Sequence, residues 1–210
     1  MYTLYGRKGS GSFAVEAVLA EAGQRYKFIE ATPGEDGKPH PGLLRLNPLG
    51  QVPTLVLPDK TVMTESAAMV IYICDRHAKA ELAPARKSKQ RAAYLRWLTF
   101  MAATIYSSNL RLYYPERYST DPNAAAGIKD AAVAALAREW GILAKALGKG
   151  KGPWLLGKKF SSADIYAAML ATWNPDLPAF YAKHPNVKAL SDGVRARKKI
   201  APIWTANAMP

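Results

Sequence analysis

The spacing of hydrophobic and polar residues along this chain changes near residue 80. Before that point, short apolar segments of the β type alternate with segments whose apolar residues recur at helical spacing. The predicted strands lie at 3–5, 26–30, 54–57 and 61–63, and the predicted helices lie at 13–22 and 66–77. A polar Pro/Gly-rich loop at 32–42 is followed by a short helical stretch, and a hairpin turn at 58–60 joins the last two strands. The order β-α-β-α-β-β-α predicts a small mixed sheet with helices packed on it.

In the rest of the chain, apolar residues recur only at helical spacing. We expect no β-strand after residue 86 and a linker at 78–85, which separates an α/β domain at 1–77 from an all-α domain at 86–210. Ser161 and Asp164 form a capping box in which Asp replaces the usual Glu or Gln, and this predicts a helix start with a structural role. The long alanine-rich helices are predicted at 87–114, 123–147, 163–173 and 186–199.

The chain is basic, with a formal net charge of +13, and nearly all of this excess lies after residue 80. Small clusters occur at 86–91, 145–151 and 195–199, without the interleaved aromatic residues of single-strand binding surfaces. We therefore expect solvated helix faces and no nucleic-acid partner; a positive field that attracts anionic substrates is compatible with this interpretation.

Composition also limits the compartment and the chemistry. No apolar run approaches the roughly 20 residues of a membrane span, and the N-terminus has no signal-like apolar core. The single cysteine, Cys74, excludes an internal disulfide framework and fits a reducing compartment, and its apolar helix predicts a buried position. Three scattered histidines offer no metal-ligand spacing. These features predict a soluble cytoplasmic protein without a metal or a membrane partner.

Two motifs carry a resemblance to a known family. The run Asn47-Pro-Leu-Gly-Gln-Val-Pro-Thr-Leu55, followed by Thr64-Glu-Ser66, resembles the glutathione-site segment of cytosolic glutathione transferases. The segment Phe160-Ser-Ser-Ala-Asp-Ile165 resembles the helix-capping segment of their C-terminal domain. The resemblance implies a thioredoxin-like N-terminal domain followed by an all-helical domain, in a homodimeric detoxification enzyme. Such an enzyme adds glutathione, its co-substrate, to small hydrophobic electrophiles.

The same resemblance implies where glutathione binds. A cis bond before Pro53 would expose the Val52 backbone to the cysteinyl backbone of glutathione, as in strand addition. Ser66 would hold the γ-glutamyl carboxylate at a helix N-terminus, and Glu65 would face the α-amino group. The residues alone also allow a trans proline, plain helix capping and a solvated loop. The glutathione-binding residues implied are Lys38, Gln51, Val52, Pro53, Glu65 and Ser66, with His40 as a second candidate for the glycyl carboxylate.

Catalysis requires a lowered thiol pKa, because a free thiol near 8.5 is only a few per cent thiolate at neutral pH. By resemblance, the activating hydroxyl lies in the loop before the first helix, where Ser10 and Ser12 are candidates and Ser10 is preferred. Tyr5 is a third candidate. The alternatives are an N-cap for Ser12 and a half-buried strand position for Tyr5. The absence of cysteine from 6–13 disfavours classes that form a mixed disulfide there.

The second substrate is expected against the first long helix of the C-terminal domain. The resemblance assigns Tyr106 and Tyr113 to this hydrophobic site, whereas Trp97 and Phe100 are expected in the core. Two other functions stay open: a glutathione-dependent disulfide or peroxide reductase, and a non-catalytic binding module on the same fold.

Overall fold

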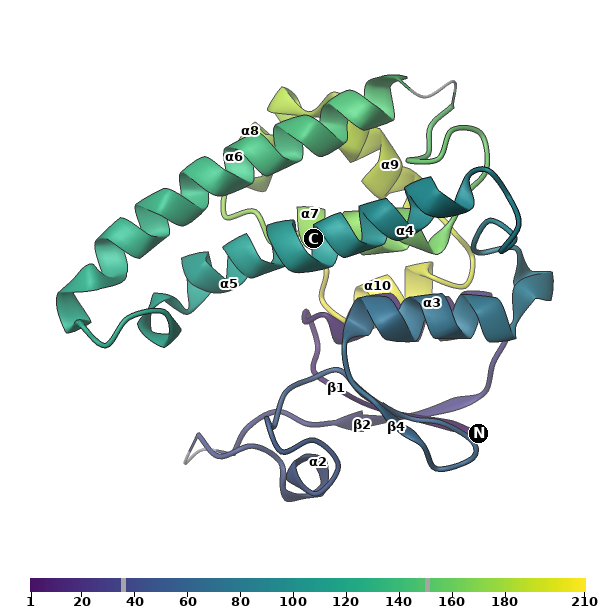
Figure 1. Cartoon of the computed structure of the whole chain (residues 1–210), viewed down its shortest axis with the longest axis horizontal. Helices are drawn as coiled ribbons and strands as arrows, with labels where there is room; N and C mark the ends of the chain where they lie inside the picture. Colours follow the sequence, from purple (N-terminus) through teal and green to yellow (C-terminus); the bar gives the residue numbers. More distant parts are fainter. Residues whose placement is uncertain (35–36, 150–151) are drawn as a thin grey trace. The chain divides into compact units, whose positions relative to one another are not determined.

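The computed structural model describes residues 1–34, 37–149 and 152–210 (Figure 1). Glu35 and Asp36, in the expected 32–42 loop, and Gly150 and Lys151, in the basic 145–151 cluster, lie outside the described residues. The chain divides into two compact units. The first contains residues 1–91 together with 192–210, and the second contains residues 92–191.

The first unit is built on a four-stranded mixed sheet of order β2-β1-β3-β4. Strand β1 is parallel to β2 and antiparallel to β3, and β4 is antiparallel to β3. The strand positions confirm the mixed sheet predicted from the sequence. Their bounds are Tyr2–Gly6 for β1, Tyr26–Glu30 for β2, Thr54–Val56 for β3 and Val62–Met63 for β4.

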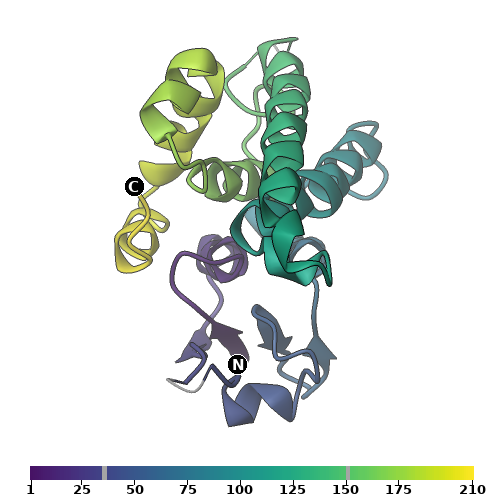
Figure 2. The same cartoon turned by 90° about the vertical axis from the view of Figure 1, so that its left-hand side faces the viewer.

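Helices cover both faces of this sheet. Helices α1 (Ser12–Glu21) and α3 (Ser66–Arg76) pack together on one face, and the short α2 (Pro41–Leu44) lies on the other (Figures 1 and 2). Helix α2 begins earlier than the predicted helical stretch, because Pro41 occupies its first turn and the His40 side chain caps it. This arrangement is the thioredoxin-like fold expected for the N-terminal part.

The second unit is helical. Helix α4 (Arg91–Phe100) continues through a π-helical segment, Met101–Ile105, into α5 (Tyr106–Tyr113), so the helix predicted at 87–114 starts later and has an irregular centre. No strand follows residue 86 among the described residues, where Trp154 and Gly157 form only an isolated bridge. The other helices are α6 (Ala125–Lys149), α7 (Ser162–Ala171), α8 (Leu177–Lys183) and α9 (Pro185–Arg195), and the last turn of α9, from Asp192, belongs to the first unit.

The last helix, α10 (Ala201–Ala206), groups with the first unit. The sequence pattern placed everything after residue 86 in one helical domain, whereas contacts assign 192–210 to the α/β unit. Packing explains the difference, because Ile203 and Trp204 are buried and α10 lies against α1. Among the described residues, none of the helices has both the length and the apolar character that a membrane span needs.

Helix α7 forms the centre of the second unit, since all ten of its residues are buried. Its predicted capping box is present. The carboxylate of Asp164 accepts hydrogen bonds from the backbone N–H groups of Leu155 and Ser161, each at 2.7 Å, and from the Ser161 hydroxyl at 3.0 Å. Burial raises the pKa of Asp164 to about 6, against the opposing effect of these donors. The box therefore fixes both the helix start and the preceding Leu155 loop.

We expect Asp164→Ala to lower the free energy of unfolding by about 2–4 kcal/mol, because it removes a helix cap and leaves buried N–H groups unpaired. Asp176→Ala is the matched control, since Asp176 caps α8 with one exposed bond to Ala179 and should cost about 1 kcal/mol. Urea denaturation measures both. Equal losses in the two variants would contradict the structural role given to the buried box.

The difference in the free energy of unfolding between the wild-type protein and Asp164→Ala should change with pH in one direction. An unfolded Asp titrates near 3.9, so with a native pKa of about 6 the native state holds more protons between these values. The contribution of Asp164 therefore falls as the pH rises from about 4 to about 6. The stability gap between the wild-type protein and Asp164→Ala should narrow over that range.

Candidate functional site

The register of the sheet gathers three separate segments at one end of the first unit. Strand β3 is antiparallel to both of its neighbours, with Tyr5 opposite Thr54 and Met63 opposite Leu55. The chain therefore leaves β1, enters β3 and leaves β4 at the same end of the sheet. The segments brought together are 7–12, 51–53 and 64–66, which contain most of the candidate site residues.

The first segment holds its two serines in a closed circuit of hydrogen bonds. The Arg7 N–H donates to Oγ of Ser12 at 3.2 Å, and the Ser10 hydroxyl donates to the Arg7 carbonyl at 2.6 Å. The two Oγ atoms lie 2.8 Å apart. Because the Ser10 proton points to Arg7, the Ser12 hydroxyl must donate to Ser10. Both hydroxyl protons are thus used inside the loop.

The two serines differ in their solvent exposure. Ser12 is 0% exposed and Ser10 is 8% exposed, so Ser10 is the more accessible of the two hydroxyls. Ser12 is the first residue of α1 and not its N-cap, which is Gly11 without a side-chain cap bond. A Cβ on Gly6 would lie 2.8 Å from that of Ser12, so glycine at the end of β1 permits this close packing.

Tyr5 lies elsewhere. Along β1 the buried residues alternate with half-buried ones, and Tyr5 points to the face opposite Leu4. Its ring contacts the ring of His40, with centroids 6.3 Å apart, beside α2. The His40 Nδ1 accepts a hydrogen bond from the Gly42 N–H at 3.1 Å, so this nitrogen is unprotonated in that contact. The structure therefore does not bring Tyr5 together with Ser10 and Ser12.

The second segment is shaped by Asn47, for which the sequence indicated no role beyond its place in the Asn47–Leu55 motif. The buried Asn47 side chain donates to the Gln51 carbonyl at 3.0 Å and to Oγ1 of Thr54 at 3.2 Å, and it accepts from the Leu49 N–H at 3.1 Å. Thr54 also donates to the Gln51 carbonyl at 3.0 Å. An Asn before Pro-x-Gly is a turn signal that could have indicated this role.

The same segment presents an unpaired stretch of backbone. The Val52–Pro53 bond is cis, as the family resemblance predicted. Pro53 is buried, Val52 is half-buried and the Gln51 side chain is exposed. Among the described residues, no partner pairs with the backbone N–H or C=O of Val52, which directly precedes β3. Backbone groups of this kind at a strand end can pair with an extended peptide.

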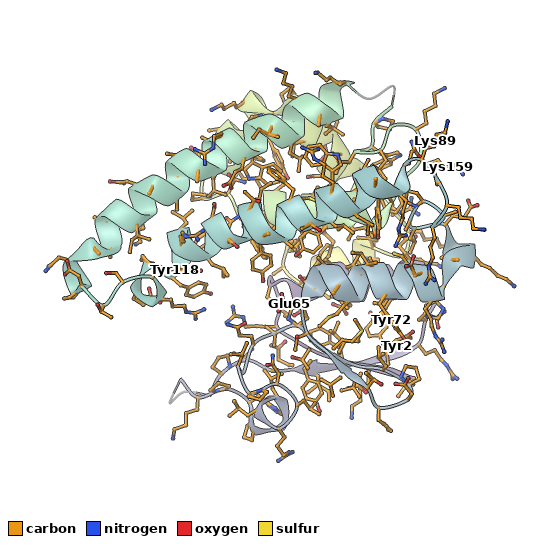
Figure 3. All side chains as sticks on the ribbon, in the orientation of Figure 1. Tyr2, Glu65, Tyr72, Lys89, Tyr118 and Lys159 are labelled. Atoms are coloured by element: carbon orange, nitrogen blue, oxygen red, sulfur yellow. The ribbon has the colours of Figure 1, made fainter. Side chains whose placement is uncertain are left out.

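The third segment begins α3. Glu65 is its N-cap residue, is exposed, and makes no side-chain cap bond (Figure 3). Its φ of 63° lies in the left-handed region, which costs a non-glycine residue roughly 1–3 kcal/mol and is concentrated at functional sites. Ser66 follows as the first helical residue, next to backbone N–H groups that have no acceptor within the helix. A carboxylate fits such a helix start.

Lys38 is exposed in the loop before α2, beside the undescribed residues 35–36. Its carbonyl accepts a hydrogen bond from the Gly34 N–H at 2.9 Å. His40 is half-buried and serves as the N-cap of α2. Of these two candidates for a glycyl carboxylate, His40 is thus already engaged in a structural contact.

Comparison with known proteins decides the family. The model for the N-terminal domain of glutathione S-transferase matches residues 12–76, and the model for its C-terminal domain matches residues 111–204. The chain is also 30% identical to the uncharacterized GST-like protein YncG of Escherichia coli strain K12, over 99% of this chain and 98% of that protein. The chain belongs to the glutathione S-transferase family.

Solved structures of glutathione S-transferases agree with this assignment. A glutathione transferase from Methylococcus capsulatus strain Bath is 27% identical, with a TM-score of 0.83 and complete coverage of both chains. A sphingomonad glutathione S-transferase, whose structure is a complex with glutathione, is 26% identical with a TM-score of 0.80, covering 99% of this chain and 100% of that one.

The aromatic residues assigned to the second substrate of the transferase meet around Trp173 in the second unit. The Tyr106 ring stands edge-on to Trp173, with centroids 4.9 Å apart, and the Tyr113 hydroxyl donates to the Trp173 carbonyl. Tyr113 is 48% exposed. Trp97 is buried, as expected, whereas Phe100, which its ring contacts, is only half-buried and so is not the core residue that was expected. The two tyrosines therefore both contact Trp173, Tyr106 through its ring and Tyr113 through its hydroxyl.

Other reactive groups of this glutathione S-transferase family member do not join the site. Cys74 forms no disulfide and is a buried residue of α3, as its apolar surroundings predicted. Within the described residues, no group of three or more His, Cys, Asp or Glu side chains is placed to hold a metal ion.

We expect Asn47→Ala to lower the free energy of unfolding by roughly 1–3 kcal/mol, because it removes one of the two donors to the Gln51 carbonyl and the acceptor of the Leu49 N–H. Hydrogen exchange should show faster opening of 49–54 than of β2. Asn123→Ala is the control, since the Asn123 side chain is exposed in the second unit. Unchanged exchange at 49–54 would contradict the role of Asn47.

Proposed function

We propose that this chain is a glutathione S-transferase enzyme that binds glutathione in its first unit and adds the thiolate to small hydrophobic electrophiles. The observation that carries the proposal is the unpaired backbone of Val52, next to β3 and at the same end of the sheet as Glu65 and Ser66. The glutathione in the related sphingomonad structure supports the choice of peptide.

Glutathione would bind as a short additional strand. The Val52 backbone would pair with the cysteinyl residue, beside Pro53 and Gln51. Because Met63 lies opposite Leu55, the chain after β4 begins α3 at the end of the sheet where Val52 precedes β3, so the γ-glutamyl carboxylate would lie at the start of α3. Glu65 would face the α-amino group, and Lys38 would meet the glycyl carboxylate at the other end of the peptide.

Thiol activation would use the hydroxyl circuit. When the Ser10 proton turns from the Arg7 carbonyl to the sulfur, the Arg7 N–H still donates to Ser12 and Ser12 still donates to Ser10. A chain of donors then ends on the thiolate, and each bond in such a chain polarises the next. Ser10 would make the contact, Ser12 would support it, and Tyr5 would take no direct part.

Tyr106 and Tyr113 would contribute the hydrophobic surface for the electrophile, with Trp173 fixing their orientation. We further propose that the protein is a cytoplasmic homodimer that serves in detoxification, as is typical of the family named above.

Glutathione should raise the thermal stability of the wild-type protein, by about 2.7 kcal/mol at a hundredfold excess over Kd. Ser66→Ala and Glu65→Ala should each weaken binding about tenfold or more, because each removes a contact to a charged group. Each tenfold loss removes about 1.4 kcal/mol of protection. Thermal unfolding with and without glutathione measures this effect.

The control for Ser66→Ala is Ser119→Ala, which removes an Oγ that accepts from the Asp121 N–H in the second unit. This control should keep full protection by glutathione. Full protection in both site variants would mean that the binding site is assigned to the wrong residues, and no protection of the wild-type protein would refute glutathione binding.

Ser10→Ala should raise the pKa of the bound glutathione thiol by about one unit and slow turnover at neutral pH about tenfold. The reason is that the lost bond to the thiolate is worth roughly 1.5–3 kcal/mol, against 0.5–1.5 kcal/mol for the neutral bond to Arg7 that it replaces. Thiolate absorbance against pH gives the first value, and a panel of electrophiles, disulfides and hydroperoxides gives the second.

Ser12→Ala should shift the same pKa in the same direction but less, and Tyr5→Phe should leave it unchanged. A silent Ser10→Ala, together with a large effect of Tyr5→Phe, would reject the hydroxyl circuit as the source of activation.

A further inference from the structure

The C-terminal segment of the chain holds the helix that begins at the hydroxyl loop. Helix α10 lies against α1 within the first unit (Figure 2). The buried ring of Trp204 stands edge-on to Phe13, with centroids 5.4 Å apart and an interplanar angle of 89°. Phe13 directly follows Ser12, so this contact fixes the first turn of α1.

A polar contact lies one turn further along α1. The carboxylate of Glu16 accepts from the Asn207 side-chain amide at 3.1 Å and from the Tyr26 hydroxyl at 3.1 Å. Burial raises the pKa of Glu16, against the lowering effect of these two donors. Asn207 is only 4% exposed, and its amide nitrogen also donates to the Ile203 carbonyl at 3.0 Å. Two acceptors therefore fix the orientation of this amide.

Asn207 also lies beside the hydroxyl loop itself. A Cβ placed on Gly9 would be 3.9 Å from the Asn207 backbone oxygen, which is ordinary van der Waals distance. The residues after it fold back, since the Trp204 indole donates to the Pro210 carbonyl at 3.1 Å and the Met209 N–H donates to the Trp204 carbonyl at 3.1 Å. The Asn207 backbone thus lies near the loop, and its side chain contacts α1.

The opposite end of α1 has a separate attachment to the same segment. The Arg197 guanidinium forms two hydrogen bonds with the Glu21 carboxylate, at 2.9 and 2.8 Å, and the Lys199 ammonium donates to the Glu21 carbonyl at 2.9 Å. This attachment is more than two helical turns away from Ser12. It can stabilise the packing of the segment without touching the loop.

We propose that Asn207 is a positioning residue for thiol activation, which holds the start of α1, and with it the loop 7–12, in place through its side-chain bond to Glu16. The inference rests on the proposed function, because it names a residue that supports the same site. The circuit of Ser10 and Ser12 depends on contacts near 3 Å, and small displacements of catalytic groups reduce rates strongly. Without the amide of Asn207, the buried Glu16 carboxylate loses one of its two donors, and the first two turns of α1 keep only the Phe13–Trp204 packing as a described side-chain contact with the C-terminal segment.

The test compares Asn207→Ala with Arg197→Gln, which removes the ion pair at the far end of α1. Both variants should lose stability, but only Asn207→Ala should raise the pKa of bound glutathione, measured by thiolate absorbance, and lower kcat at neutral pH by about tenfold. The KM for glutathione should change little, because the residues proposed to bind the peptide are untouched. Asn207→Ser is a milder substitution to use if Asn207→Ala does not fold.

A second measurement does not depend on glutathione. Hydrogen exchange of the amides at 7–12 should be faster in Asn207→Ala than in Arg197→Gln, relative to the amides of β2, whereas a general loss of stability would affect both regions alike. Equal exchange in the two variants, or an unshifted thiol pKa in Asn207→Ala, would overturn the inference. If the wild-type protein binds no glutathione, the proposed function fails, and the exchange comparison still decides whether Asn207 holds the loop.

Discussion

The antiparallel pairing of one short strand, β3, organises the whole candidate site. Thr54–Val56 pairs with β1 on one side and β4 on the other, and so forces the loop after β1, the turn before β3 and the start of α3 to one end of the sheet. Thr54 reinforces this arrangement, because its buried hydroxyl joins the bonds that shape the preceding turn. Three short motifs become one site only through this register. A change of register by one residue would turn their side chains to the other face and separate them.

The sequence predicted elements whose boundaries are marked locally. Strand β2 has the predicted bounds because Tyr26–Glu30 follows the polar pair Gln24 and Arg25 and ends close to the Pro/Gly-rich loop. Helix α1 ends before Gly23, whose φ of 68° suits glycine. The π-helical segment at Met101–Ile105 could not be predicted, since its apolar residues continue the pattern of α4. The sequence pattern did not predict helices α8 and α10, because they are short and have Pro in their first turn. Neither periodicity nor composition showed that α10 would pack on the first unit, because that depends on contacts between residues nearly a chain length apart.

The candidate site also combines features that the sequence predicted with features that it did not. The motifs identified which residue types to consider, and the half-buried strand position given as the alternative for Tyr5 is the one that it has in β1. The relation between Ser10 and Ser12 could not be deduced, because it depends on which acceptor takes each hydroxyl proton. Asn207 was missed for a different reason: it is 191 residues from Glu16, and an isolated Asn near a chain end carries no pattern. Long-range polar contacts of this kind are specified by the fold and not by a local signal.

The closed circuit also limits how much of the activation one serine can supply. Before the thiolate forms, the Ser10 hydroxyl already makes a hydrogen bond to the Arg7 carbonyl, so the gain on ionisation is the difference between a charged and a neutral bond. That difference is about 1–1.5 kcal/mol, or about one pKa unit, whereas a shift of two units needs about 2.7 kcal/mol. In the mechanism we propose, the remainder would come from the N-terminal end of α1, where backbone N–H groups and the helix dipole contribute roughly 0.3–2 kcal/mol to a nearby anion. Activation of this kind would depend on where α1 begins as much as on the hydroxyl, and the contacts that fix its first two turns would be part of the same mechanism.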